Sequence, residues 1–341
     1  MAEATMLTRR TILAMPLALA ACKIRNPVVT LSGTTMGTTY NIVAIDAESA
    51  LNRDDLKSAV EGALFEVNAQ LSNWDPVSEV STFNRSTATG LIEASDAMRT
   101  VVAGAQAVHS ASDGVFDITM GPLIEAWGFG ATGMAGRTPS DAAIAAAAES
   151  VGIDKIALAE GGLTKAAPGT ELFLSAIGKG YGVDRLAGAL DSLGVENYMV
   201  EIGGDLITKG RNADGTPWQI GIETPTVGGG VEQIAAVSGF GMATSGDYRN
   251  YFEVDGQRYS HLLDARTGRP ITHRTASATV LTNTAMMADA WATAMLILGR
   301  ERGMEIADKL DLAVLFIDRH GSGATATFKS TPSRRYAELI G

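Results

Sequence analysis

Hydrophobic and polar positions follow two different periods along this chain, and each period predicts one kind of element. Between Val28 and Ile45 they alternate on both sides of a Gly-Thr break, which predicts a hairpin of two strands. Elsewhere apolar residues recur at helical spacing. On this pattern we expect helices over Asp54–Leu71, Ser95–Ser112, Asp141–Val151, Ile177–Leu193, Thr284–Leu298 and Arg302–Leu310.

Short apolar or alternating runs predict that strands dominate the second half of the chain. The segment Asn73–Gly90 is polar and rich in turn residues, and Gly114–Gly136 is predicted to be an ordered loop. Because helices and strands follow no regular alternation, the predicted fold class is α+β, with a mixed, largely antiparallel sheet flanked by helices. The expected strands are Leu172–Leu174, Tyr198–Ile202, Leu206–Lys209, Trp218–Glu223, Gln233–Val237, Tyr259–Leu263 and Ala276–Leu281, followed by a hairpin of Leu312–Asp318 with Ala324–Lys329.

The first residues carry the features of an export signal. Arg9 and Arg10 precede an uncharged apolar run from Thr11 to Ala21, which is too short to span a bilayer but suits the core of a signal peptide. The arginine pair resembles a twin-arginine signal. The small residues before Cys22 resemble a bacterial lipobox, in which the cysteine is lipidated and becomes the new N-terminus.

These features predict how the chain is divided. We expect residues 1–21 to be a lipoprotein signal peptide, 22–32 a tether, 33–330 the folded domain and 331–341 a C-terminal tail. A lipid on Cys22 would anchor the protein to a membrane of the bacterial cell envelope, facing the periplasm.

Composition narrows the class of protein and the ligands that it can hold. The 341 residues are 46% hydrophobic and 19% charged, which excludes a disordered chain, and a single cysteine excludes an internal disulfide. The net charge of −11 argues against nucleic acid as a partner. Without residues 1–21, which contain Glu3, Arg9 and Arg10, the balance is 25 − 37 = −12. An anionic ligand would therefore depend on local positive groups.

Asp289 and Thr293 form the first candidate site. They lie four residues apart on a predicted helix, so their oxygens project from one face among Met, Ala, Trp and Leu side chains. A carboxylate on an apolar face has to be paired, hydrogen-bonded or metal-bound. A carboxylate with a hydroxyl suits Mg²⁺ better than zinc. From spacing alone, a hydrogen-bonded Asp and a Thr bonded to its own helix are the simpler interpretation.

Lys179 is a candidate for binding an anion. It falls in the first turn of a predicted helix, where backbone amides and an ammonium group can hold a phosphate, although a solvated lysine beside a tight turn fits equally well. The segment Gly128–Gly133 matches G-x-G-x-x-G but follows no predicted strand. We therefore discount it as a dinucleotide fingerprint.

His261 is the candidate general base. It lies in a strand-like run with the densest polar surroundings of the four histidines, and Asp264 at the end of that run is placed to orient it. A structural histidine followed by a turn is the alternative. His109, His273 and His320 are predicted to lie at the surface or in loops.

A series of short motifs resembles the ApbE-type FAD:protein FMN transferases, a family of flavin transferases. The motifs run in the family's order from about Gly33 to Phe316, and this common order makes the resemblance specific although each motif alone is weak. They are Gly33–Thr38, Leu71–Trp74 with Ser78–Glu79 and Phe83–Asn84, Phe116–Leu123, Trp127–Gly130, Ala176–Asp184, Val200–Asp205, Ala243–Tyr248, Ser260–Pro270 and Ala288–Thr293.

The resemblance implies an ApbE-like fold and a Mg²⁺-dependent transfer of FMN from FAD to a threonine side chain of an acceptor protein, with release of AMP. Acceptors of the family are subunits of ion-pumping redox complexes and exported flavoproteins, so we expect a partner of that kind. The implied base is His261, and the implied metal ligands are Asp289, Thr293 and the backbone carbonyl of Ala176. The residues implied to contact FAD are Met36, Trp74, Val115, Phe116, Asp117, Lys179 and Leu263.

Two other functions stay open on the sequence. The chain could be a Mg²⁺-dependent FAD pyrophosphatase that yields FMN and AMP, or a flavin-binding lipoprotein without chemistry.

Two positions depart from the family's usual pattern: Trp74 stands where a tyrosine is usual, and Phe173 where an acidic residue is usual. The first bears on the balance between transfer and hydrolysis, and the second on the affinity for FAD.

Overall fold

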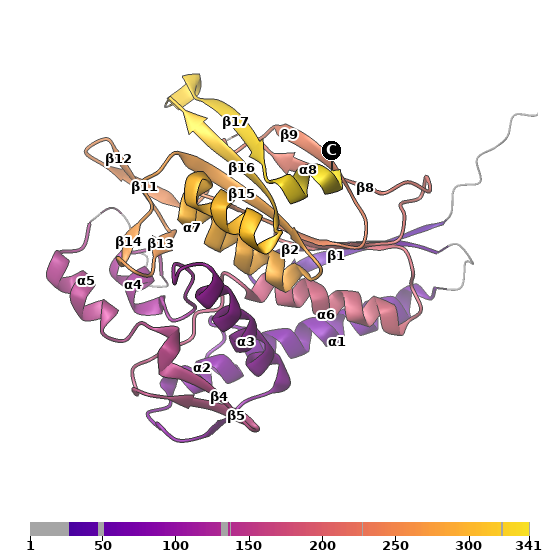
Figure 1. The fold of residues 1–341 in the computed structure, drawn as a ribbon. Coiled ribbons are helices and arrows are strands. Elements are labelled where there is room, and N and C mark those ends of the chain that lie inside the picture. Colours follow the sequence, from indigo (N-terminus) through magenta and orange to yellow (C-terminus); the bar gives the residue numbers. More distant parts are fainter. Residues whose placement is uncertain are drawn as a thin grey trace, which may run out of the picture.

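The computed structural model describes residues 27–46, 51–130, 136, 138–226, 228–321 and 323–340 (Figure 1). The predicted signal peptide, Cys22 and part of the Gly128–Gly133 match lie outside these residues. No helix in the described part of the chain is long and apolar enough to cross a membrane. The export signal and the lipid anchor therefore stay predictions.

An antiparallel sheet of eight strands forms the centre of the fold. Its order is β1-β2-β6-β7-β10-β15-β16-β17, and every neighbouring pair runs antiparallel. This arrangement confirms the predicted α+β class with a largely antiparallel sheet. The strands are β1 (Val28–Thr35), β2 (Thr38–Ile45), β6 (Tyr198–Ile202), β7 (Asp205–Lys209), β10 (Gly241–Gly246), β15 (Thr275–Thr282), β16 (Ala313–His320) and β17 (Thr327–Pro332).

Both faces of this sheet are covered. Val314 and Phe316 of β16 belong to the core on the side of the long helices. Their neighbours Leu315 and Ile317 belong to the core on the opposite side. Because strand residues alternate between the two faces, a strand that is covered on both sides reads as a continuous apolar run.

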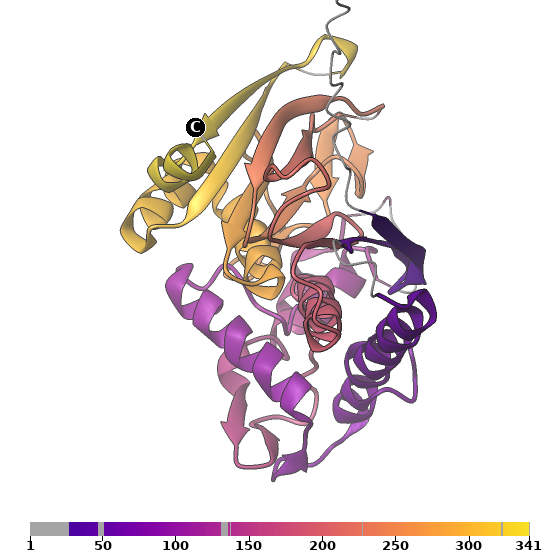
Figure 2. The same ribbon diagram turned by 90° about the vertical axis from the view of Figure 1, so that its right-hand side faces the viewer.

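Different elements supply the two covers. Figures 1 and 2 show the long helices gathered on one side of the sheet. The core on the opposite side contains residues of a two-stranded sheet and of the last helix. The helical side is built from α1 (Arg53–Leu71), α3 (Asp96–Ala111), α6 (Gly178–Ser192) and α7 (Ala285–Leu310). The opposite side is built from β8 (Trp218–Glu223), β9 (Val231–Val237) and α8 (Arg334–Ile340).

Smaller elements complete the fold around the helical side. A three-stranded sheet packs beside α3, and two short hairpins lie near α4 and α5 in Figure 1. Their bounds are α2 (Glu79–Arg85), β3 (Ile92–Glu93), α4 (Gly121–Ala126), α5 (Asp141–Ala148), β4 (Ile156–Ala159), β5 (Gly162–Lys165), β11 (Tyr251–Val254), β12 (Gln257–Ser260), β13 (Leu263–Asp264) and β14 (Arg269–Pro270), with 3₁₀ turns at Ile153–Lys155 and Gly323–Thr325.

The segment Leu172–Leu174 is not the strand that we predicted. Side-chain amides, not a neighbouring strand, form the hydrogen bonds with the backbone of this segment. Asn84 Oδ1 accepts from the Leu172 amide at 2.8 Å, and Nδ2 donates to the Leu172 carbonyl at 2.9 Å. Asn73 donates to the same carbonyl at 2.7 Å and accepts from the Leu174 amide at 2.8 Å. Two asparagines thus hold the segment that leads into α6.

Other segments are more regular than their composition indicates. Asn73–Gly90 contains α2, which begins after the N-cap Ser78, and the predicted loop Gly114–Gly136 contains α4. The two helices predicted over 284–310 are both present, and α7 comprises the pair with a kink between them at Gly299, whose backbone angles are non-helical (φ 72°, ψ 166°). The predicted C-terminal tail includes α8, whose Tyr336 is buried.

Candidate active site

A cavity of about 520 Å³ lies where the sheet, the first turns of α6 and α7, and the loop before α4 meet. This volume is within the usual range of small-molecule sites. Every site residue proposed from the sequence lines it except Met36: Trp74, Val115, Phe116, Asp117, Ala176, Lys179, His261, Leu263, Asp289 and Thr293. Met36 lines a separate groove between the β1–β2 hairpin and α1.

Helices α6 and α7 approach each other very closely beside this cavity. A Cβ atom at Gly180 would overlap the Ala285 carbonyl group and would lie 2.7 Å from Met286 Cα. On the same helix, the Asp184 carboxylate accepts hydrogen bonds from the backbone amides of Ala285 at 2.7 Å and Met286 at 2.9 Å. Glycine permits the contact and Asp184 caps the first turn of α7, so the two helices are held in one relative position.

This contact brings Lys179 of α6 to Asp289 of α7. Both Asp289 oxygens lie 3.4 Å from Lys179 Nζ, and Asp289 Oδ2 also accepts from the Gly180 amide at 3.1 Å. Asp205, the first residue of β7, comes closer still, because its Oδ2 lies 2.8 Å from Lys179 Nζ. The Asp205 and Asp289 side chains are each 4% exposed. Two buried carboxylates and a half-buried ammonium from distant parts of the chain thus form one cluster.

Burial and mutual charge shift the protonation equilibria in this cluster. Burial alone disfavours a charged ammonium, but Asp205 and Asp289 outweigh it and raise the pKa of Lys179 above its ordinary value. Burial, followed by the nearby Asp289 carboxylate, raises the pKa of Asp205 well above its ordinary value, although Lys179 opposes the shift. Lys179 is therefore a permanent cation at neutral pH.

The cavity also offers a set of hard oxygen donors. Thr293 lies one helical turn after Asp289, and its hydroxyl is 3.1 Å from the Ser245 hydroxyl of β10. Ala176 lines the cavity in the turn before α6. A carboxylate, a hydroxyl and a backbone carbonyl fit Mg²⁺. Within the described residues no group of three or more His, Cys, Asp and Glu side chains is placed to hold a metal alone. A cation here would therefore take further ligands from substrate phosphates or water.

His261 is oriented by a backbone carbonyl. Its Nδ1 lies 3.0 Å from the Asn250 carbonyl oxygen. Because a carbonyl only accepts, Nδ1 donates, which leaves the Nε2 lone pair free to accept a proton. Burial lowers the pKa of His261, against the opposing effects of the Asn250 carbonyl and Asp247. The imidazole is therefore neutral at neutral pH, as a general base requires.

Two expectations about this histidine were wrong. The predicted strand Tyr259–Leu263 is divided, since β12 ends at Ser260 and β13 begins at Leu263, which places His261 in the bend between them. Asp264 does not orient the ring, because its carboxylate accepts instead from Arg266 at 2.7–3.3 Å. Aspartate in the first position of a turn bonds its own neighbours readily, and the sequence alone does not reveal this competition.

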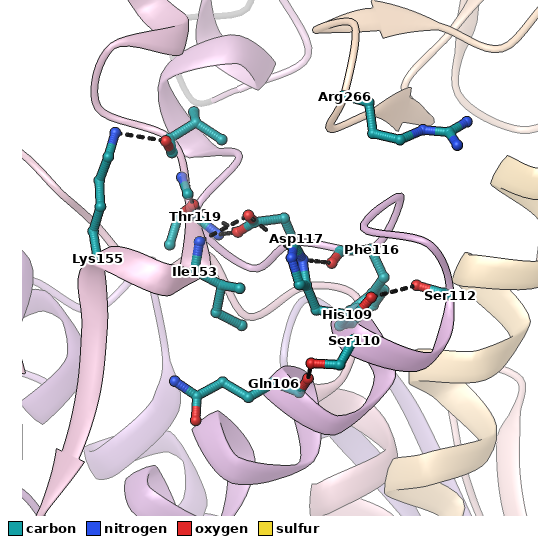
Figure 3. A network of polar contacts seen from close by, with 12 residues as sticks. Gln106, His109, Ser110, Ser112, Phe116, Asp117, Thr119, Ile153, Lys155 and Arg266 are labelled. Carbon is teal, nitrogen blue, oxygen red and sulfur yellow. Dashed lines mark hydrogen bonds and ion pairs between the residues drawn. The ribbon is translucent and has the colours of Figure 1, made fainter.

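The loop that carries Val115, Phe116 and Asp117 is held by a polar network (Figure 3). Asp117 Oδ1 accepts from the Thr119 amide at 2.7 Å and hydroxyl at 2.6 Å, and Oδ2 accepts from the Ile153 amide at 2.9 Å. The Asp117 carboxylate therefore stabilises the loop. A contact between Asp117 and a ligand would come from its backbone atoms. His109 Nδ1 lies 2.8 Å from the Phe116 carbonyl oxygen, so this half-buried histidine supports the cavity wall.

Aromatic side chains form another wall of the cavity. Trp74 is 64% exposed, and its ring lies edge-on to Phe173 with the ring centroids 6.4 Å apart. Phe129 lies edge-on to His261 at 6.3 Å. Flat apolar faces at a cavity mouth suit a planar ring system. The two departures from the family pattern, Trp74 and Phe173, thus contact each other at one end of the site.

Sequence reasoning missed three groups that complete the site. Asp205 is the closest partner of Lys179, Asn250 orients His261, and His109 supports Phe116. Asp205 did fall within a motif, directly after Gly203 and Gly204 and at the start of a strand, where polar side chains often reach a site. The carbonyl of Asn250 carries no sequence signal, because every residue has one.

Fold and site together define an α+β protein whose cavity combines oxygen donors for a hard cation, a half-buried ammonium for an anion and a neutral imidazole. The ApbE family model matches residues 36–316. The chain belongs to the ApbE family.

Individual relatives agree with this assignment. The chain is 42% identical to the FAD:protein FMN transferase of Haemophilus influenzae over 91% of its own length and 92% of the relative's. It is also 42% identical to that of Vibrio cholerae, over 93% and 96% of the two chains. The solved structure of the flavin transferase ApbE from Vibrio cholerae superposes with a TM-score of 0.84 at 40% identity, covering 92% of this chain and 100% of that chain. The apo form of the Pseudomonas stutzeri flavinyl transferase ApbE gives a TM-score of 0.85 at 38% identity, covering 93% and 98%.

Proposed function

We propose that this chain is a FAD:protein FMN transferase, which moves FMN from FAD to a threonine hydroxyl of an acceptor protein and releases AMP. One observation carries the proposal: Lys179, the Asp289–Thr293 pair and His261 line the same cavity. The names of the relatives, FAD:protein FMN transferase, support it. A protein that only stored flavin would have little use for an oriented base in the same cavity as a lysine and a carboxylate.

The charged cluster would bind the diphosphate of FAD. The Lys179 ammonium is a permanent cation that can pair with phosphate oxygens, and the positive end of the α6 dipole favours the same negative charge. Asp289, Thr293 and the Ala176 carbonyl would hold Mg²⁺, which when bound supplies further neutralisation of phosphate charge. The aromatic wall of Trp74 and Phe173 offers a face for a ring of the dinucleotide.

His261 would act on the acceptor. Its Nε2 takes the proton of the threonine hydroxyl as that oxygen attacks the phosphorus next to the flavin ribityl chain. A new oxygen–phosphorus bond forms, and the bond between this phosphorus and the bridging oxygen breaks. AMP leaves with that electron pair, and Lys179 stabilises the negative charge that develops on the phosphates.

The proposed setting follows from the first residues of the chain. We infer that residues 1–21 direct export and that Cys22 anchors the protein to a membrane, with the folded domain facing the periplasm. Support for this setting is the charge placement and the small residues before Cys22. Mass spectrometry of the membrane fraction tests it, since a mature chain that begins at an unmodified residue would refute the anchor.

The test of function combines the full-length protein, FAD, Mg²⁺ and an acceptor protein that carries a flavinylation threonine. We expect an acceptor whose intact mass rises by one FMN unit, with one AMP released per modified acceptor. Free FMN and AMP without an adduct would indicate a pyrophosphatase, and neither product would indicate a binding protein. His261→Ala should bind FAD but transfer nothing, whereas replacement of the exposed His320 by alanine should keep activity.

A further inference from the structure

Asp205 has no part in the mechanism above, yet it is the closest partner of Lys179. It begins β7 directly after the Gly203–Gly204 turn, and its side chain is 4% exposed. Lys179 Nζ lies 2.8 Å from Asp205 Oδ2 but 3.4 Å from each oxygen of Asp289. The ammonium therefore makes its shortest contact, an ion pair, with Asp205, while its hydrogen bonds to the two Asp289 oxygens are at the outer limit of hydrogen-bond distance.

This difference in distance matters because Lys179 and a divalent cation would use the same carboxylate. A carboxylate as buried as Asp289 is strongly unfavourable without a positive partner, and the half-buried Lys179 ammonium is the cation beside it. If Asp205 were absent, Lys179 would be expected to close on Asp289, the remaining carboxylate of the cluster. A divalent cation would then have to displace the ammonium before it could use the Asp289 oxygens.

We propose that Asp205 is a positioning residue that draws the Lys179 ammonium toward itself, keeps its contacts with the Asp289 oxygens long and so leaves those oxygens available to a divalent cation. The inference rests on the proposed function in its use of Mg²⁺. Asp205 acts through Lys179 and does not itself touch the cation. The same contact keeps the ammonium charged and directed into the cavity, where the diphosphate would bind.

Two simpler roles for Asp205 would also favour cation binding. It could be a metal ligand, or its negative charge could attract the cation at a distance. Neither role depends on Lys179. Replacing Asp205 and Lys179 singly and together therefore distinguishes positioning from both alternatives, because only positioning requires the lysine.

The experiment measures the binding of Mg²⁺ alone to the full-length protein by isothermal titration calorimetry, without FAD. Asp205→Asn should weaken Mg²⁺ binding roughly 10- to 100-fold, as the loss of an outer partner of a metal site does. In a Lys179→Met background the same substitution should change the affinity by less than about twofold. A matched control is Asp191→Asn, because Asp191 pairs with Lys209 at 2.8 Å between α6 and β7 but is exposed. This control should leave the affinity unchanged.

The outcomes separate cleanly. An equal loss of Mg²⁺ affinity in both backgrounds would mean that Asp205 acts on the cation itself. No loss of affinity in the Asp205→Asn single variant would mean that Lys179 needs no positioning. Either result overturns the inference. Wild-type protein that binds no Mg²⁺ without FAD would overturn the inference, because the Asp289 oxygens would then not be available to the cation by themselves. The proposed function is tested separately, by whether AMP release from FAD requires added Mg²⁺. Circular dichroism checks the fold, and Asp205→Ser in both backgrounds makes the same comparison if the Asn variant does not fold.

Discussion

Gly180→Ala should weaken both the fold and the site, because α6 and α7 have no room for a methyl group at this position. The added Cβ would overlap the Ala285 carbonyl and lie 2.7 Å from Met286 Cα, closer than side chains approach backbone atoms in folded proteins. The two helices would have to separate, because backbone atoms and not a flexible side chain occupy this space. The Gly180 amide donates to Asp289 Oδ2, and Lys179 precedes it, so any separation also widens the charged cluster.

The magnitude follows from a comparison with Gly188, which lies on the same helix. A Cβ at Gly188 would meet no atom within 4 Å, and this glycine is exposed. Alanine stabilises an exposed helix interior by about 1 kcal/mol relative to glycine, so Gly188→Ala should raise the free energy of unfolding. Overpacking at Gly180 costs about 1–3 kcal/mol. Both glycines lie in α6, so the gain from alanine applies at both positions and cancels in the comparison. The two variants should therefore differ by the overpacking cost of about 1–3 kcal/mol, with Gly180→Ala the less stable.

Urea denaturation followed by circular dichroism measures the two free energies of unfolding, and release of AMP from FAD measures the site. We expect Gly188→Ala to keep full activity and Gly180→Ala to lose most of it. Equal stability of the two variants would refute the argument that close packing of α6 on α7 requires glycine. Equal activity with unequal stability would refute only the link between this packing and the site.

Three further predictions concern single ionisable groups. Asp289→Ala should abolish turnover through loss of Mg²⁺ binding. Calorimetry should then show no heat of Mg²⁺ binding, and no AMP should form. A residual activity above roughly 1% of wild type would contradict the assignment of Asp289 as a metal ligand. Because burial lowers the pKa of His261, turnover should stay constant above neutral pH and fall as the pH drops through that depressed pKa, and a pH–rate profile without an acid limb would exclude this base. Burial raises the pKa of Asp184 to about 6, so folding favours the protonated form of this side chain. The stability that the protonated Asp184 contributes is fully present below the pKa of the unfolded chain and is lost as the pH rises through about 6. The difference in unfolding free energy between wild type and Asp184→Asn should thus change by about 1–3 kcal/mol between pH 4 and pH 7, and a difference independent of pH would contradict this account.

Local patterns were enough for much of the secondary structure. The helical spacing in α1, α3 and α6 and the alternation in the β1–β2 hairpin arise from burial of one side of each element, which leaves a direct trace in the order of residues. Elements whose partners are remote left weaker traces. Leu172–Leu174 is apolar like a strand, but two asparagines about 90–100 positions away bind its backbone. The segment of the short helix α2 is polar, and its residues predict turns and no helix.

The residues of the site likewise fall into those that local patterns predict and those that they do not. Asp289 and Thr293 could be placed on one face of a helix, and Lys179 at a helix start, because residues three or four apart in a helix have a known spatial relation. His261 could be chosen for its polar neighbours, but the group that orients it could not. Asp264 is close in sequence and bonds Arg266, whereas the backbone carbonyl of Asn250, eleven residues earlier, holds the ring.

By itself, the sequence determined the α+β class, most of the elements, the acidic charge that forces an anionic ligand onto local cations, and the order of motifs that resembles the ApbE family. Only the tertiary structure decided that Lys179, Asp205 and Asp289 share one cluster and that Met36 lies outside the cavity. The physical reason is the range of the interactions. Helical and strand periods are set by neighbours within a few residues, whereas the pairing of buried charges depends on where the sheet and the α6–α7 contact bring distant residues together.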